Sequence, residues 1–158
     1  MIGRCIVGLA ALAIAICANA ADGSIFVQRC AVCHLESATG SPGFVPPLTD
    51  TLGYYVAADG GRAYLVRVVS YGLTGPITVA GVAYDATMAL YAPLSDQQAA
   101  DALNYVLTQF NTKSLPAQFK PFTAGEVHGA RQEKVSAIEL HAARQALIDE
   151  LARAGKHR

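Results

Sequence analysis

The pattern Cys30-Ala31-Val32-Cys33-His34 constrains this 158-residue chain more than any other feature. Two thiols three residues apart on a turn of helix can each add to one vinyl group of a haem, and the histidine after the second thiol then points its imidazole at the iron. The pattern therefore predicts one covalently bound haem c, attached through Cys30 and Cys33, with His34 as an axial ligand. The sequence holds no second copy of the pattern, which excludes multihaem forms.

Closely spaced cysteines also serve three other kinds of site. A thioredoxin-like redox site requires a βαβ context, which the pattern of this chain lacks. A structural zinc site requires further cysteine or histidine ligands at suitable spacing. Two lone cysteines in an oxidising compartment also suit a disulfide. Haem attachment is favoured because a histidine follows directly and because the chain begins with an export signal.

Residues 1–20 have the composition of a secretory signal peptide. They hold one basic residue, an apolar stretch over 5–17, and the small-x-small cleavage site Ala18-Asn19-Ala20. We expect cleavage after Ala20 and a periplasmic mature protein. A retained membrane anchor, for which the apolar run is short, and acylation of Cys17 are the alternatives. Cleavage leaves Cys30 and Cys33 as the only cysteines.

The charge of the mature chain limits its partners. The full sequence has 12 basic and 12 acidic residues, and the signal removes only Arg4, which leaves 11 and 12. Near-neutrality argues against nucleic acid or an anionic membrane surface as the main partner.

Three helices are expected in the region 21–115, which we predict to be one domain. The first follows Asp22-Gly23-Ser24 and carries the cysteine motif at its C-terminal end, the second runs from about 60 to 71, and the third begins at the capping box of Ser95. A loop is expected over 36–50, and a short extended segment over 77–79. The apolar face of the third helix indicates core packing and consists of Ala99, Leu103, Val106, Leu107 and Phe110.

The region 116–158 is predicted to be a helical C-terminal extension. Two similar segments, 123–131 and 136–144, begin with the capping-box pairs Thr123 with Glu126 and Ser136 with Glu139. These pairs predict two short helices, the second running to about Ala154. The extension has too few large apolar residues for a core of its own, so we interpret it as an appendage.

Met88 is the candidate for the sixth ligand of the iron. It is the only methionine left after Met1 departs with the signal, and it lies in a loop 54 residues after His34. A His34/Met88 pair would raise the reduction potential and close the iron to other ligands, which favours electron transfer over oxygen chemistry. A lone methionine is also a common core filler. The rival ligands are expected at the surface of the polar tail and are His128, His141 and His157.

The run Phe26-Val27-Gln28-Arg29-Cys30-Ala31-Val32-Cys33-His34 resembles the haem-binding helix of class I cytochromes c, and the resemblance extends over roughly 23–110. It implies a small all-α, cytochrome c-like domain wrapped around one covalent haem. Phe44-Val45-Pro46-Pro47-Leu48 is similar to the proline loop of that family, which implies that the Pro46 carbonyl accepts the Nδ1–H of His34. The run 72–88 resembles a bacterial subgroup of periplasmic electron carriers and haem subunits.

The same resemblance implies that the third helix crosses the first through an apolar contact of Gly23, Phe26 and Tyr105. The chain departs from the family at Ala89, where a proline often follows the ligand methionine. Four tyrosines suit either the haem edge and a propionate or ordinary core packing, and we assign them no role: Tyr54, Tyr55, Tyr84 and Tyr91.

These observations predict a monohaem electron carrier, not an enzyme, that passes single electrons between redox partners such as a dehydrogenase and an oxidase. Two alternatives stay open. The chain would be a haem subunit docked permanently on a dehydrogenase through residues 121–158, or a haem enzyme or sensor in which Met88 lies away from the iron.

Overall fold

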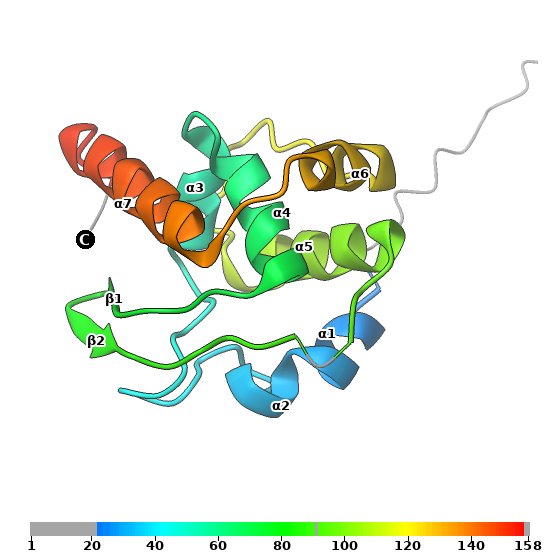
Figure 1. Cartoon of the computed structure of the whole chain (residues 1–158), viewed down its shortest axis with the longest axis horizontal. Helices are drawn as coiled ribbons and strands as arrows, with labels where there is room; N and C mark the ends of the chain where they lie inside the picture. The colour runs from blue at the N-terminus through cyan, green and yellow to red at the C-terminus, as the bar shows by residue number, and fades with distance from the viewer. Residues whose placement is uncertain (1–21, 91, 157–158) are drawn as a thin grey trace, which may run out of the picture.

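The structure, a computed structural model, describes residues 22–90 and 92–156. The predicted signal peptide, Tyr91 and His157 therefore lie outside the described residues. The described chain is mostly helical, which confirms the predicted all-α class, with one short β-hairpin (Figure 1). The elements are α1 (Ser24–Arg29), α2 (Ala31–His34), α3 (Leu52–Ala57), α4 (Gly61–Tyr71), β1 (Ile77–Val79), β2 (Val82–Tyr84), α5 (Asp96–Phe110), α6 (Ala124–Gln132) and α7 (Ala137–Arg153).

The predicted first helix is divided into α1 and α2 at Cys30. The Asp22 carboxylate accepts the backbone N–H of Ser24 at 2.9 Å, in a turn just before α1, whose N-cap residue is Gly23. Cys30 has a φ of −110°, away from the helical value, and α2 then forms a single turn that carries Cys33 and His34. Leu35, with a φ of 64°, ends that turn.

Helices α1 and α5 cross at close range, as predicted. A Cβ on Gly23 would lie 2.5 Å from the Tyr105 ring, so only glycine fits without a shift of its neighbours. The fully buried Phe26 ring lies 5.4 Å from the Tyr105 ring and 5.3 Å from the Phe110 ring, centroid to centroid. This contact fixes the cysteine-bearing turn against α5.

Helix α3 was not predicted. Its six residues are too few for a readable period, and its start is fixed by a distant residue: the Asn111 side-chain oxygen accepts the Leu52 N–H at 2.9 Å. The second predicted helix is confirmed as α4, which begins after Gly60 at a φ of 68°.

The predicted extended segment is confirmed as β1, and its pairing with β2 was not predicted. The two strands are antiparallel, with Thr78 opposite Ala83. Beyond the hairpin, Met88 pairs with Leu73 through both backbone groups, at 2.8 and 3.2 Å. The third predicted helix is confirmed as α5, and Ser95 and Gln98 form its capping box.

Both predicted tail helices are present, as α6 and α7. Ser136 and Glu139 form the complete capping box of α7. At α6 the predicted box is only half right: Thr123 accepts the Glu126 N–H, but the Glu126 carboxylate binds Arg62 instead of the cap. A guanidinium offers the carboxylate two charge-assisted hydrogen bonds, which are stronger than one bond to a backbone N–H.

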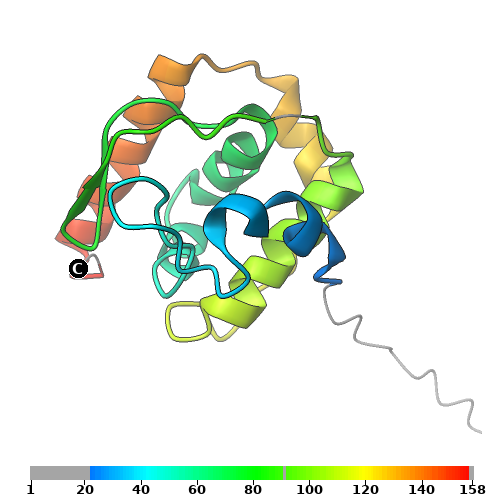
Figure 2. The ribbon, with the colours of Figure 1, turned by 90° about the horizontal axis from the view of Figure 1, so that it is seen from below.

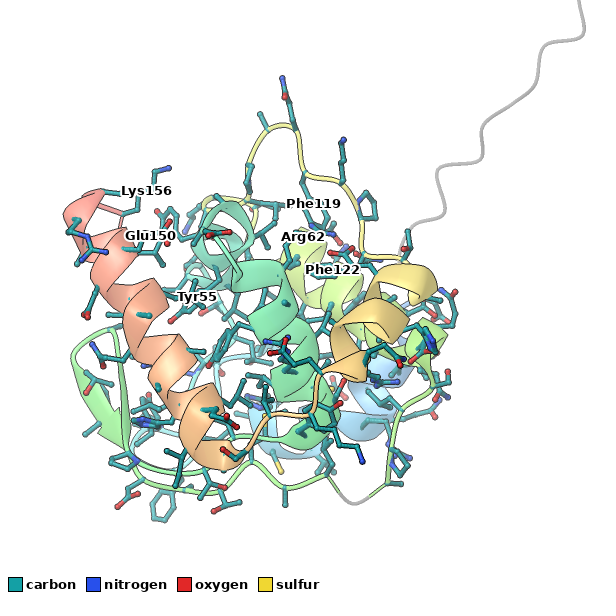
Figure 3. All side chains as sticks on the ribbon, turned by 45° about the horizontal axis from the view of Figure 1, so that its top comes forward. Tyr55, Arg62, Phe119, Phe122, Glu150 and Lys156 are labelled. Atoms are coloured by element: carbon teal, nitrogen blue, oxygen red, sulfur yellow. The ribbon has the colours of Figure 1, made fainter. Side chains whose placement is uncertain are left out.

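The extension packs on the rest of the chain. In Figure 1, α6 and α7 lie next to α4 on the side away from α1 and α2. The apolar side chains that the extension adds to the main core are Phe122, Val127, Leu140, Leu147 and Leu151. The guanidinium carbon of Arg62, a residue of α4, lies 3.8 Å from the centroid of the Phe122 ring (Figure 3). Over the described ranges, no helix is both long and apolar enough to cross a membrane.

Candidate cofactor site

A cavity of about 310 Å³ is lined by residues from almost every element of the described chain, from Arg29 to Lys156. Viewed from below, the loop after α2 extends toward the side of the molecule where the hairpin and α7 lie (Figure 2). The wall is mostly apolar and includes Leu52, Leu65, Val68, Val69, Leu103 and Val106. A cavity of this kind suits a large, flat, mainly apolar cofactor.

His34 occupies one wall of the cavity and is 6% exposed. Its Nδ1 donates to the Pro46 carbonyl oxygen at 3.0 Å, the contact that the family resemblance implies. Burial lowers the pKa of the His34 imidazole, and the hydrogen bond to Pro46 acts in the opposite direction. The neutral ring keeps the proton on Nδ1 and leaves Nε2 with a lone pair, which a metal ion requires.

The close approach of the proline loop to α2 depends on Gly40. This residue has a φ of 63°, and a Cβ on it would lie 2.2 Å from the Val45 carbonyl oxygen and 2.7 Å from that of Pro46. The Gly40 N–H also binds the His34 carbonyl at 3.0 Å. Glycine therefore brings the Pro46 carbonyl within reach of the imidazole.

Both cysteines of the motif line the same cavity as free thiols, Cys30 half-buried and Cys33 exposed. Burial raises the pKa of the Cys30 thiol, and the neighbouring charge of Arg29 partly opposes that shift. Within 22–90 and 92–156, no three histidine, cysteine or acidic side chains are grouped to hold a metal ion.

Met88 lines the cavity together with His34. Its backbone is held by Leu73, and Gly72 makes this pairing close: a Cβ on Gly72, at a φ of 80°, would lie 2.1 Å from the Met88 carbonyl oxygen. The loop that carries Met88 is therefore fixed by backbone pairing, although Ala89 stands where the family often has proline.

The described rival ligands lie away from the cavity wall. His128 is exposed, and its Nδ1 lies 3.2 Å from the Asp96 carboxylate. The His141 Nε2 donates to the Pro76 carbonyl at 2.7 Å.

The structure adds polar residues that the sequence analysis did not assign. Tyr54, Tyr55, Tyr64 and Tyr84 all line the cavity, and so does Arg144 of α7. A signal for Arg144 is present in the sequence, because it occupies a position of the buried stripe of α7, whose other members are Leu140, Leu147 and Leu151.

The chemistry of these side chains fits haem c. Two free thiols stand ready for thioether bonds, a buried neutral imidazole and a thioether are the two axial ligand types of electron-transfer haems, and apolar walls exclude water. The residues are Cys30, Cys33, His34 and Met88, all at one cavity.

Comparison with known proteins agrees with this fit. No protein-family model matches the chain. The chain is 39% identical over 127 residues to cytochrome c-552 of Thermus thermophilus. This alignment covers 80% of the chain and 97% of the relative. It is equally similar to cytochrome c-552 of Thermus thermophilus strain ATCC 27634 / DSM 579, over 86% of that relative. Because only 115 residues precede position 116, an alignment of 127 residues reaches into the C-terminal extension.

Proposed function

Because the chain belongs to the cytochrome c-552 family, within the class I monohaem cytochromes c, we propose that it carries single electrons between periplasmic redox partners through one haem with His34 and Met88 as axial ligands. As a cytochrome c, the chain is a haem c electron carrier. A bound haem supplies the one-electron oxidation and reduction of its iron, and the protein supplies attachment, orientation and electrostatics.

One observation carries the ligand assignment. The two thiols, the buried His34 and Met88 all line a single apolar cavity. In this proposal, Cys30 and Cys33 would hold the haem through thioethers, and His34 and Met88 would ligate its iron. Pro46 fixes the tautomer and orientation of His34 by accepting its Nδ1–H.

The surrounding residues adjust the reduction potential. Apolar walls lower the local dielectric constant and so disfavour the more highly charged oxidised state. A His/Met pair raises the potential further. Leu73, by pairing with the Met88 backbone, keeps the thioether at the cavity.

The rim of the cavity supports contact with other redox proteins. Val32 and Phe44 line the cavity and are 79% and 74% exposed. Exposed apolar side chains beside a redox centre suit brief docking of a partner such as a dehydrogenase or an oxidase. Since α7 buries its apolar stripe in the core of this chain, the extension has a role within the fold, and we favour a freely diffusing carrier over a permanent subunit.

The ligand assignment is tested by spectroscopy of the oxidised protein and of the Met88→Ala variant. The wild-type protein should show the weak near-infrared band at about 695 nm that reports iron–sulfur bonding. Met88→Ala should lose this band, lower the potential and bind CO rapidly when reduced, whereas Val82→Ala, on an exposed residue that does not line the cavity, should change none of these. An unchanged spectrum in Met88→Ala would exclude Met88 as ligand and favour the enzyme or sensor alternative.

Export is tested separately by the mass of the mature protein. We propose that residues 1–20 are removed, so the mature chain should begin at Ala21 and carry the added mass of one haem. A mass that includes residues 1–20 would indicate a retained anchor.

A further inference from the structure

Helix α7 brings a buried arginine to the cofactor cavity. Arg144 is 7% exposed and lies on the buried stripe of α7, between Leu140 and Leu147. Arginine is rarely buried to this degree unless it is paired. Its position in an otherwise apolar stripe therefore requires a specific partner.

The partners within the described chain do not meet that requirement. The guanidinium has five N–H donors, and one of them, on Nη2, donates to the Thr78 carbonyl at 2.9 Å. Among the described residues no carboxylate forms an ion pair with Arg144, and no aspartate or glutamate lines the cavity. Burial of an uncompensated charge is strongly unfavourable, so an anion from outside the chain is expected at this point.

Two tyrosines from other helices line the same cavity as Arg144. Tyr55 of α3 and Tyr64 of α4 are each 6% exposed and their rings stack at 5.8 Å between centroids. Both line the cavity, and neither hydroxyl is sealed away from it. Figure 3 places Tyr55 between α4 and α7.

The charge of Arg144 acts on both phenols. Burial raises the pKa of Tyr55 and of Tyr64, and the positive charge of Arg144 opposes the rise at each. Both hydroxyls therefore keep their protons at neutral pH and are free to donate. Two phenol hydroxyls, from α3 and α4, and the guanidinium of α7 can therefore donate hydrogen bonds to one anion in the cavity.

We propose that Arg144, Tyr55 and Tyr64 bind one propionate of the haem, so that the C-terminal extension completes the cofactor site. This inference rests on the proposed function, which places a haem in the cavity. A planar guanidinium fork matches a carboxylate in geometry, and the phenols add two further hydrogen bonds. The other basic residues of the wall, Arg29 and Lys156, are exposed, and Arg29 already donates to the Ala92 carbonyl at 2.8 Å.

The test measures the pKa of the propionates in the haem-bearing protein. NMR titration of the propionate methylene protons should give one propionate a low pKa in the wild-type protein. Arg144→Gln removes the cation and should raise that pKa by about 1–3 units. The matched control is Arg153→Gln, on an exposed arginine of the same helix, which should leave the titration unchanged.

A second readout is the reduction potential as a function of pH. Ionisation of a propionate lowers the potential, because negative charge stabilises the oxidised haem. In Arg144→Gln this fall should therefore begin at a higher pH than in the wild-type protein, by the same 1–3 units or so. Arg144→Lys keeps the charge but loses the two parallel N–H donors of the guanidinium, and Tyr64→Phe loses one hydroxyl donor. In both variants, the pH at which the reduction potential begins to fall should therefore change by less than in Arg144→Gln.

The outcomes separate this inference from the proposed function. Covalent haem by mass and the near-infrared band test the proposed function in the wild-type protein, and their absence would remove that proposal. With both present, an Arg144→Gln titration equal to that of the wild type would overturn the propionate site. A purely structural role would reduce stability without moving the propionate pKa, which would overturn it as well. If Arg144→Gln does not accumulate, the Arg144→Lys and Tyr64→Phe titrations decide in the same way.

Discussion

Gly23 sets how closely the cysteine-bearing end of the chain approaches α5. Its missing Cβ leaves room for the Tyr105 ring, whereas Gly129 in α6 has open space around it. We expect Gly23→Ala to cost about 1–3 kcal/mol of unfolding free energy, because the ring must move out of its packed position. Gly129→Ala should instead stabilise by about 0.5–1 kcal/mol. Urea unfolding measures both, and equal effects would contradict the close packing.

Some residues of the cofactor site can be predicted from the local sequence, and others cannot. Cys30, Cys33 and His34 lie within five consecutive residues, so the motif alone predicts that they hold one haem. Pro46 required the family resemblance. The position of Arg144 in the apolar stripe of α7 indicates that it is buried, but its place at the cofactor cavity follows only once α7 is packed against the hairpin.

Among the elements, α7 depends on its capping box. The Ser136 N–H and hydroxyl donate to the Glu139 carboxylate, and these bonds lower the pKa of Glu139 below its ordinary value of 4.5. A carboxyl whose pKa is lower in the folded state stabilises the fold above the ordinary value, and this contribution is lost as pH falls through the folded-state pKa.

Glu139→Gln should therefore be less stable than the wild type at neutral pH, and the difference should narrow as the solution is acidified below about pH 4.5. The control is Glu36→Gln, which removes one carboxylate from an exposed loop instead of from a capping box. Thermal unfolding at a series of pH values measures both. A difference that stays constant with pH would argue against the cap.

Helix α6 is held by Arg62 of α4. Its guanidinium donates to both Glu126 carboxylate oxygens, at 2.6 and 2.7 Å, and lies over the Phe122 ring. A double-mutant cycle of Arg62→Ala and Glu126→Ala should give a coupling energy of about 1 kcal/mol, because the bidentate geometry is fixed. The exposed pair Lys113 and Asp50, 3.6 Å apart, should give a coupling near zero. Equal couplings would contradict the structural role of Arg62.

The longer helices were predictable, whereas two short elements, α3 and β2, were not. The helices α4, α5 and α7 span several turns, so their period is visible in the sequence, as are the capping boxes of α5 and α7. Helix α3 and strand β2 have six and three residues. Their conformations are fixed by tertiary partners, such as Asn111 at the start of α3, which a local pattern does not reveal.

For the whole molecule, the extension belongs to the main core. Leu147 of α7 is 5% exposed within that core, whereas Ile138 of the same helix is 83% exposed. Leu147→Ala should cost about 2–5 kcal/mol, since it leaves a cavity. Ile138→Ala should change stability by no more than about 0.5 kcal/mol. Denaturant unfolding compares them, and a small effect of Leu147→Ala would mean that the extension is only loosely attached.

The residues that line the cavity are spread along the chain from Arg29 to Lys156, so the cavity is complete only when the last segment has folded. A chain synthesised N-terminus first presents its two thiols early, while α7 arrives last. The part of the wall that Arg144 and Leu151 supply is therefore the last to form. Bringing such distant segments together carries a loop-closure entropy cost, and a cofactor already fixed to the first segment gives the last one a surface on which to fold.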